Sequence, residues 1–352
     1  MRIANVIGSI GLLMLCGCAS MGPQRMGVDR SDYATHLRET NKEQMLLNIV
    51  AMRYGDAPLF LEVSSVISQY TREGSLNASV PVAAPLGSTD PGFVGGGVLL
   101  RETPTITYTP LSGDRFARSL LSPIAPASLL GLVESGWSIE HVFPVVLRTI
   151  NGVSNGSRNP LFAHTADPNF AGVVDAMTRL QRSRSLILHV EHGPESQFSA
   201  KASLSPTPSE QDLVDLNYLV GTLNLPGDGK GEFKIGFGDG QIAKDTLTLG
   251  TRSVFEIFSE LAQGVEVPEE DSHGRAVATS SGAAGALTLI RIHSGTARPA
   301  DAHAAVRYRG HWFWIDGTDE QSKRTFLIAQ IILSLNDTSG GTNAPLVTIP
   351  TG

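Results

Sequence analysis

Residues 186–223 read LILHVEHGPESQFSAKASLSPTPSEQDLVDLNYLVGTL. Two runs in this stretch, Leu186–Glu191 and Phe198–Leu204, have the composition and length of strands. A helix is expected near Ser209–Leu223, after these two runs. The stretch therefore predicts two strands followed by a helix, a unit typical of α+β proteins.

The same order of elements recurs toward the C-terminus, although no sequence repeat accompanies it. We expect strands at 232–237 and 241–249 before a helix that Thr251 caps and that ends near Gln263. Three further runs, 286–293, 304–309 and 312–315, precede a helix at 320–335, and a last strand is expected at 346–349. Strands joined in hairpins and followed by helices predict a mostly antiparallel sheet with covering helices.

The preceding part of the chain, 31–166, is expected to be richer in helix. A helix is expected from about Thr40 to Tyr54, followed by an extended run at 59–70 and several short helices after Ser112. Residues 98–100 and 105–108 predict a short hairpin, and Gly95–Gly97 a bend or flexible point. We therefore divide the chain into 1–17, a tether at 18–30, a helix-rich region at 31–166 and an α+β region at 167–352.

The N-terminus has the features of a bacterial lipoprotein signal. Arg2 precedes an apolar run from Ile3 to Leu15, which is too short to span a bilayer but has the length of a signal-peptide core. The next residues, Leu15-Cys16-Gly17-Cys18, resemble a lipobox, which implies cleavage after Gly17 and a covalent lipid on Cys18. The residue after the cysteine is Ala19 rather than Asp, which by resemblance to the sorting rule of enteric bacteria favours the outer membrane.

Composition excludes several classes of function. The chain has 27 basic and 34 acidic side chains, a net charge of −7, and an acidic protein of this kind does not favour nucleic acid as a partner. Both cysteines lie in the lipobox, so a processed chain would have no free thiol for a disulfide, a metal site or a nucleophile. We expect no cofactor other than the covalent lipid.

Gly152-Val153-Ser154-Asn155-Gly156 matches the pattern of the nucleophile elbow of serine hydrolases. That motif functions only between a buried strand and a helix, and the residues after Gly156 do not predict a helix. Acid and base partners could come from Asp167 or Asp316 and from His164, His303 or His311, but no spacing selects among them. A glycine-rich loop is the alternative interpretation.

His189-Val190-Glu191-His192 is the best metal-site candidate in the sequence. On a strand His189 and Glu191 would share one face and His192 would point away. Zinc requires three or four converging ligands, so we expect no metal here.

The densest aromatic segment is Arg307-Tyr308-Arg309-Gly310-His311-Trp312-Phe313-Trp314-Ile315. In a strand Trp312 and Trp314 share a face, and a turn at Gly310 would bring Arg307 and Arg309 beside them. Exposed tryptophans with arginines can stack on sugar rings or bind a protein partner. A buried core strand is the alternative interpretation.

Three segments carry a family resemblance: Asn41–Asp56, Val306–Asp316 and Gln321–Phe326. They resemble a group of uncharacterised proteobacterial lipoproteins for which no activity is known. The resemblance implies an envelope location and assigns no catalytic residue. We expect an outer-membrane lipoprotein with a periplasmic body that acts as an accessory or scaffolding part of an envelope assembly through a protein partner. The alternatives are a glycan- or peptidoglycan-binding module at Trp312 and Trp314, and a serine hydrolase at Ser154.

Overall fold

The computed structural model describes residues 21–78, 94–162, 164–192, 198–204, 207–225, 232–240, 243–278 and 287–336. The chain forms two compact units. One, which we call the body, holds Met1–Pro58 and Leu120–Asn336, and the other, the hairpin unit, holds Leu59–Ser119 and Asp337–Gly352. Cys18 and the expected strand at 346–349 lie outside the described residues. The observed units therefore run differently from the expected regions 31–166 and 167–352.

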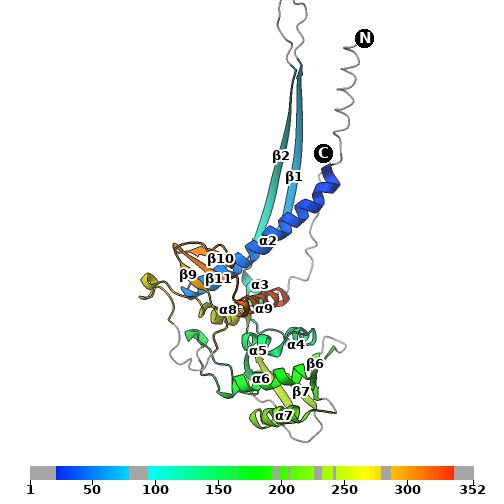
Figure 1. Cartoon of the computed structure of the whole chain (residues 1–352), viewed down its shortest axis with the longest axis vertical. Coiled ribbons are helices and arrows are strands. Elements are labelled where there is room, and N and C mark those ends of the chain that lie inside the picture. The colour runs from blue at the N-terminus through cyan, green and yellow to red at the C-terminus, as the bar shows by residue number, and fades with distance from the viewer. Residues whose placement is uncertain are drawn as a thin grey trace, which may run out of the picture. The chain divides into compact units, whose positions relative to one another are not determined.

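The secondary structure is that of an α+β protein, as the sequence predicted (Figure 1). The α-helices are α2 (Met21–Arg53), α3 (Gly113–Phe116), α4 (Pro126–Glu134), α5 (Ile139–Val146), α6 (Asn169–Arg182), α7 (Glu210–Thr222), α8 (Val254–Ala262) and α9 (Glu320–Asn336). Short helical turns are found at Ala117–Leu121, Pro160–Phe162 and Glu269–Asp271.

The body contains two sheets. The larger has the order β4-β3-β8-β7-β6-β5 and is antiparallel except for the parallel pair β7–β8. Its strands are β3 (Leu147–Ile150), β4 (Val153–Ser154), β5 (Leu186–His192), β6 (Phe198–Leu204), β7 (Glu232–Phe237) and β8 (Thr246–Thr251). The smaller, β10-β11-β9, is antiparallel and consists of β9 (His293–Gly295), β10 (Ala302–Tyr308) and β11 (His311–Asp316).

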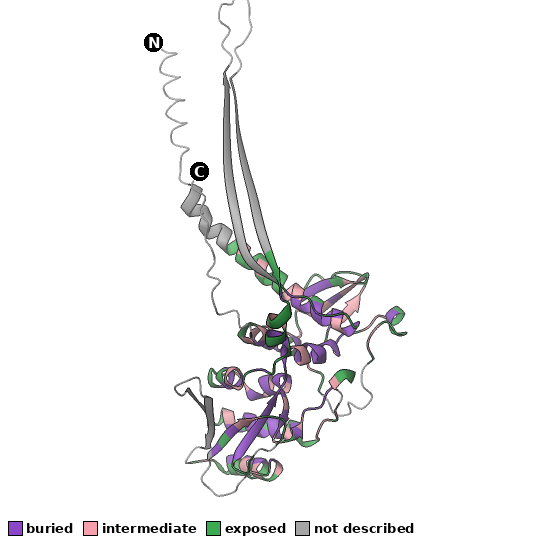
Figure 2. Ribbon diagram, turned by 180° about the vertical axis from the view of Figure 1, so that it is seen from behind, coloured by how far each residue is buried: buried purple, intermediate pink, exposed green. Residues whose placement is uncertain are grey.

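Helices join the two sheets into one apolar core. α6 packs on β4 and β5, α2 packs on β10 and α8, and α9 packs on β11, α5 and α8. Phe143 of α5, Phe258 of α8, Phe313 of β11 and Phe326 of α9 are fully buried where these elements meet. Figure 2 shows the buried residues in purple, concentrated between the helices and sheets of the body. Large aromatic side chains contribute strongly to core energetics, so this contact region carries much of the body's stability.

Local signals explain several element boundaries. Ser209 and Asp212 form a reciprocal capping box at the start of α7, and Ser253 and Glu256 form another at the start of α8. The expected cap of α8, Thr251, was wrong by two residues, because Thr251 is the last residue of β8. The tether expected at 18–30 is also wrong from Met21 onward, because these residues belong to α2.

The hairpin unit is built on one long antiparallel pair, β1 (Leu61–Ala78) and β2 (Val94–Pro110). The short hairpin expected at 98–100 and 105–108 was therefore wrong, since both runs belong to β2. Gly95–Gly97, expected as a bend, continue the strand and pair with Ser75–Asn77. Their extended conformation follows from cross-strand backbone pairing, which a propensity argument on one strand does not include.

Candidate functional site

The aromatic segment forms a tight hairpin in the smaller sheet. Arg309 (φ 47°) and Gly310 (φ 93°) are both left-handed, the backbone of a two-residue hairpin turn whose twist matches that of the strands. The turn pairs Tyr308 with His311 and Arg307 with Trp312. On the other side of β11, Trp312 pairs with Gly295 and Trp314 with His293.

Strand alternation separates the aromatic residues onto two faces. Phe313 and Ile315 are fully buried, because they lie on the face that α2 and α9 cover. Trp312 and Trp314 lie on the opposite face and are half-buried. The strand is therefore neither only a buried core strand nor only an exposed binding strand. Phe313 and Ile315 belong to the core, and the two tryptophans lie on the other face.

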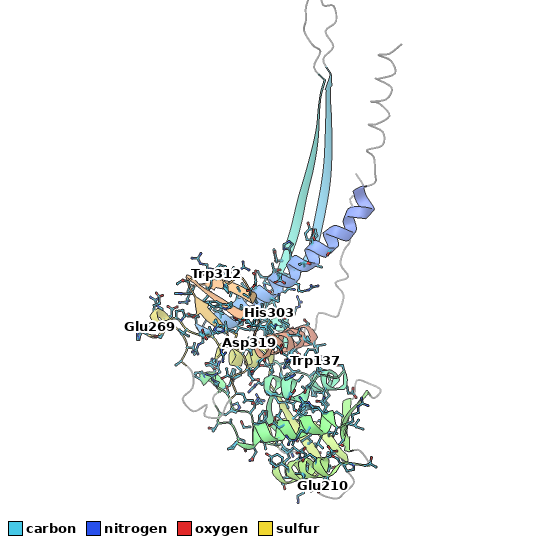
Figure 3. All side chains as sticks on the ribbon, in the orientation of Figure 1. Trp137, Glu210, Glu269, His303, Trp312 and Asp319 are labelled. Carbon is cyan, nitrogen blue, oxygen red and sulfur yellow. The ribbon has the colours of Figure 1, made fainter. Side chains whose placement is uncertain are left out.

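Residues from three segments surround the two indoles. The guanidinium carbon of Arg298 lies 5.3 Å from the centroid of the Trp312 ring, within cation–π range. The His293 ring lies 5.7 Å from that of Trp314, at an interplanar angle of 31°. Arg307 is exposed and is the direct cross-strand partner of Trp312. We call this set, His293, Arg298, Arg307, Trp312 and Trp314, the Trp face; Figure 3 labels Trp312 on it.

Gly295 shapes the Trp face. A β-carbon at this position would lie 3.2 Å from the Trp314 ring, closer than ordinary contact. The glycine therefore lets the indole of Trp314 lie across β9. The tight fit gives Trp314 a defined orientation, which a stacking platform requires.

Two of the three basic side chains of the Trp face lie close to an acidic side chain. Arg298 is 3.3 Å from Glu43 of α2, and Nδ1 of His293 is 3.0 Å from Glu266. Arg307 has no ion-pair partner among the described residues. Trp312 thus has one guanidinium over its ring and a second arginine, Arg307, as its cross-strand neighbour, an arrangement suited to an anionic or hydroxyl-rich partner.

Arg309, expected beside the tryptophans, is directed elsewhere. Its guanidinium lies 3.2 Å from Asp56 and over the rings of Tyr54 and Tyr308, at 5.2 and 5.6 Å. Tyr308 donates a hydrogen bond to Asp56, and this bond, followed by that from Arg309, lowers the pKa of the Asp56 carboxyl. Arg309 therefore ties the hairpin turn to the end of α2 and is not part of the Trp face.

The acidic segment after α8 is partly folded against the same end of α2. Asp271 is buried, and its carboxylate accepts hydrogen bonds of 3.0 Å from Tyr54 and from Arg275. Arg53 donates to the side chain of Gln263 and to the carbonyl of Val277. Asp271 is therefore part of the folded body, although it lies in a strongly acidic segment.

Ser154 does not have the geometry of a nucleophile elbow. Asn151 and Gly152, with φ of 49° and 86°, form the turn of the β3–β4 hairpin, and Ser154 ends β4 opposite Thr149. Its hydroxyl accepts a hydrogen bond of 3.1 Å from the N–H of Gly156. A non-helical loop follows, so no helix N-terminus provides oxyanion donors at this serine.

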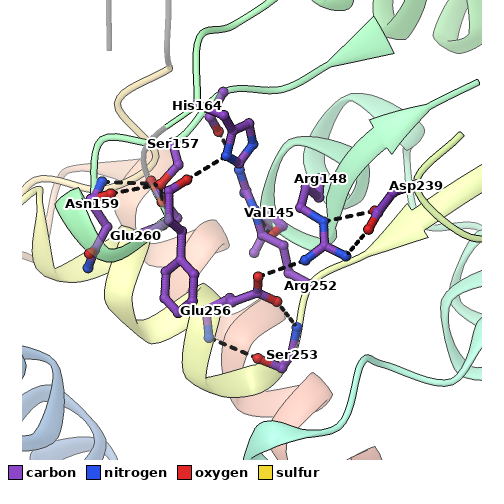
Figure 4. A network of polar contacts seen from close by, with 12 residues as sticks. Val145, Arg148, Ser157, Asn159, His164, Asp239, Arg252, Ser253, Glu256 and Glu260 are labelled. Carbon is purple, nitrogen blue, oxygen red and sulfur yellow. Dashed lines mark hydrogen bonds and ion pairs between the residues drawn. The ribbon is translucent and has the colours of Figure 1, made fainter. Parts of the chain in front are cut away.

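The next residues of that loop belong to a buried polar network (Figure 4). Ser157 donates to the carboxylate of Glu260 on α8, which also accepts from the N–H of Arg158. Arg252, 4% exposed, donates to the carbonyls of Pro144, Val145 and Gly156. The network joins α5, α8 and the loop, and its burial makes it a structural element rather than a reaction site.

Arg148 extends the network to the edge of the body. It forms a two-bond fork with Asp239, at 2.8 and 2.9 Å, and an ion pair of 2.8 Å with Glu256. Burial lowers the pKa of Arg148, but the bonds to Asp239 and Glu256 outweigh it and raise the pKa overall. The glycine-rich segment at 236–240 therefore serves to hold Asp239 against β3.

The histidine motif that the sequence offered as a metal-site candidate lies on an edge strand of the larger sheet. His189 to His192 lie on β5, paired with Lys201 to Phe198 of β6. Among the residues that the structure describes, no group of three or more His, Cys, Asp or Glu could hold a metal ion. Within the same residues, no helix is long and apolar enough to cross a membrane.

Two members of the Trp face, His293 and Arg298, were missed by sequence reasoning. His293 stood at the end of an expected strand, where nothing indicated an aromatic partner. Arg298 lies in the loop between β9 and β10 and meets Trp312 only through the fold. Comparisons with protein-family models, curated proteins and solved structures found no match for this chain.

Proposed function

We propose that this chain is a lipoprotein of the outer membrane, anchored through Cys18, with a periplasmic body that serves as an accessory or scaffolding component of an envelope assembly. The observation that carries the anchor is the run Leu15-Cys16-Gly17-Cys18 after a short apolar core. Acyl chains on a processed cysteine would hold the body at the membrane, since two chains suffice for stable anchoring.

The scaffolding role is supported by the Trp face of the body. Tryptophan and arginine are the residue types most enriched at the energetic centres of protein interfaces. Here Trp312 is half-buried, with the guanidinium of Arg298 over its ring and Arg307 as its cross-strand partner. In this proposal the chain binds a partner rather than catalysing a reaction.

Fractionation of cells that express single variants tests the anchor. We expect Cys18→Ala to move the protein into the soluble periplasmic fraction and to abolish fatty-acid labelling. Cys16→Ala is the matched control and should remain acylated and membrane-bound. Membrane retention of Cys18→Ala would show that the anchor proposal is wrong.

Affinity purification in mild detergent, followed by mass spectrometry, tests the assembly. We expect a stoichiometric envelope protein to purify with the wild type and to be lost from Trp312→Ala/Trp314→Ala. Leu213→Ala, at a 47% exposed position on α7, is the control and should keep the partner. A wild type that purifies alone would contradict the scaffolding role.

A glycan or peptidoglycan strand is the second candidate for the Trp face. The arrangement of Trp314 on Gly295 favours it, because a fixed indole face can stack on a sugar ring. Purified sacculi should then sediment with the wild type and with Leu213→Ala, but not with Trp312→Ala/Trp314→Ala. Wild type that stays in the supernatant would remove this candidate and leave the protein partner.

A further inference from the structure

Two histidines contact the helix α9 from different elements of the body. α9 packs on α5, α8 and β11, and so lies between α5 and the smaller sheet (Figure 1). His141 of α5 meets Arg324 of α9, and His303 of β10, which Figure 3 labels, meets Phe326 of α9. Both histidines therefore lie where a change of their charge acts on the packing of α9.

The contact of His141 with α9 determines which ring nitrogen carries the proton. Nε2 of His141 lies 3.0 Å from a terminal nitrogen of the Arg324 guanidinium. A guanidinium has N–H donors and no acceptor, so Nε2 must accept this hydrogen bond and must itself be unprotonated. The imidazole is therefore neutral in this arrangement, with its proton on Nδ1.

The same nitrogen has a second partner on its own helix. Nε2 of His141 is 3.3 Å from the carboxylate of Glu140, which also forms an ion pair of 2.5 Å with Arg182 of α6. An unprotonated nitrogen cannot donate to that carboxylate, whereas a protonated one can. Arg324 has an alternative partner within α9, since it lies 3.6 Å from Glu320. Protonation of His141 thus exchanges a bond between α5 and α9 for contacts within each helix.

His303 lies against α9 from the side of the smaller sheet. Its ring and that of Phe326 have centroids 6.0 Å apart and an interplanar angle of 89°. Lys42 of α2 donates to the carbonyl oxygen of His303 at 3.1 Å and is paired with Glu39 at 2.8 Å. Lys323 of α9 adds a second positive charge near the ring. Protonation of His303 would therefore place a charge next to two lysines and against the buried ring of Phe326.

Protonation is disfavoured at both histidines for the same physical reasons. Burial, followed by the charge of Arg324, lowers the pKa of His141 below its ordinary 6.5. Burial, followed by the charge of Lys42, lowers the pKa of His303 in the same way. A neighbouring glutamate opposes the effect at each site without outweighing it. Acid therefore favours any state in which α9 has moved away and the two rings are hydrated.

We propose that α9 is an acid-sensitive latch, which neutral His141 and His303 hold on the body and which their protonation loosens. Because protonation is disfavoured while α9 is docked, the docked state keeps its full stability above pH 6.5 and loses it as the pH falls below that value. α9 packs on β11, so its loosening also withdraws support from the strand that carries the Trp face. This consequence rests on the proposed function, whereas the latch itself does not.

Hydrogen exchange of the α9 backbone amides tests the latch on the full chain with Cys16→Ser and Cys18→Ser. The protection factor, which corrects for the pH dependence of the intrinsic exchange rate, is compared at about pH 7.5 and about pH 5.5, the range in which imidazole changes charge. We expect the protection of α9 to fall by at least about tenfold, the factor that corresponds to one pKa unit. Protection of α7, which lies on α6, should stay unchanged.

A glutamine pair separates the two histidines from other effects of acid. His141→Gln/His303→Gln removes both titratable rings, and the glutamine oxygen at position 141 can still accept from Arg324. We expect its α9 to be equally protected at both pH values. His36→Gln/His273→Gln, at two exposed positions, is the matched control and should respond to acid as the parent does. A parent whose α9 stays protected in acid, or a glutamine pair that loses protection like the parent, would overturn the proposal.

Nitrogen NMR of the histidine side chains gives a second measurement that does not require the double variant to fold. With ¹⁵N-labelled histidine, and with His141→Gln to assign the signal, His141 should carry its proton on Nδ1 at about pH 7.5. Its protonation should accompany the loss of α9 protection. A His141 with its proton on Nε2 at this pH could not accept from Arg324 and would rule out the latch.

Discussion

The guanidinium of Arg298 lies over the Trp312 ring, 5.3 Å from its centroid, and the same side chain is 3.3 Å from Glu43. This arginine thereby joins the loop after β9, the aromatic strand β11 and α2. The Arg298 side chain is more than half exposed, so burial does not hold it against the indole. Its position follows from the arrangement of the residues of the Trp face. Its ion pair with Glu43 is a surface pair and contributes little to stability.

Replacing Arg298 separates binding from folding. We expect Arg298→Ala to lower the free energy of unfolding by less than about 1 kcal/mol, the range of an exposed cation–π contact. It should weaken binding of the Trp-face partner by at least about tenfold, since tryptophan–arginine clusters concentrate binding energy. Titration of the partner or of sacculi, beside urea unfolding, measures both effects.

Arg182→Ala is the matched control for that prediction. Arg182 forms an exposed ion pair with Glu140 on other helices, so its loss removes an arginine without touching the Trp face. Equal binding losses in the two variants would show that the effect comes from net charge. Unchanged binding in Arg298→Ala would remove this residue from the recognition surface.

The buried guanidinium of Arg252 should be a major determinant of stability. It donates to three carbonyl oxygens, so Arg252→Ala would leave these acceptors and nearby Glu260 without their donor or counter-charge. Loss of one member of a buried charge network costs about 3–5 kcal/mol. Urea unfolding should show this loss, with Arg182→Ala shifting stability by less than about 1 kcal/mol.

Arg252→Lys refines that prediction. Lysine keeps the charge, but its single ammonium does not reproduce the planar fork that reaches separate carbonyls. We therefore expect a stability between those of wild type and Arg252→Ala. A lysine variant as stable as the wild type would mean that charge alone, and not the forked geometry, stabilises the network.

Asp212 should make the body less stable in acid. Its carboxylate accepts from Ser183 and Ser185, which follow α6, and from the side chain and N–H of Ser209 before α7. The bond from Ser183, followed by those from Ser209 and Ser185, holds the pKa of Asp212 well below its ordinary 3.8. A depressed pKa contributes stability that is present above 3.8 and is lost as the pH falls through the folded-state value.

Denaturant unfolding along an acid pH series checks this expectation. Asp212→Asn should be less stable than the wild type at neutral pH, and the difference should shrink as the pH falls below 3.8. Asp32→Asn lies outside these contacts and is the control. A difference that is constant with pH would show that the carboxylate charge is not responsible.

Local signals in the sequence predicted part of this fold well. β6 and β7 have the predicted bounds, Phe198–Leu204 and Glu232–Phe237, and α7 lies within the predicted 209–223. Strand composition acts over a few residues, so single-sequence reasoning captures it. The α8 cap was missed because pairing of β8 with β3 extends that strand to Thr251.

Only part of the Trp face could be predicted from the sequence, because some of its contacts join residues that are distant in sequence. Alternation places Trp312 and Trp314 together from the sequence alone, and the turn at Gly310 makes Arg307 their neighbour. Whether Arg309 joins them depends on Asp56, which is distant in sequence and reaches the turn through the packing of α2 on β10. Such long-range contacts leave no local pattern.

Tyr54 should couple the acidic segment to α2 in a pH-dependent way. Its hydroxyl donates to the buried carboxylate of Asp271, so Tyr54→Phe should lower the free energy of unfolding by about 1–3 kcal/mol at neutral pH. Burial opposes ionisation of Asp271, but hydrogen bonds from Arg275 and Tyr54 outweigh it and lower its pKa. Without the tyrosine hydroxyl that pKa should rise toward 3.8, so the cost of Tyr54→Phe should diminish as the pH falls below 3.8.

Tyr218→Phe, at a position 37% exposed, removes the same atom without this contact and should be nearly neutral at every pH. Equal costs for the two variants would mean that the bond to Asp271 does not stabilise the body.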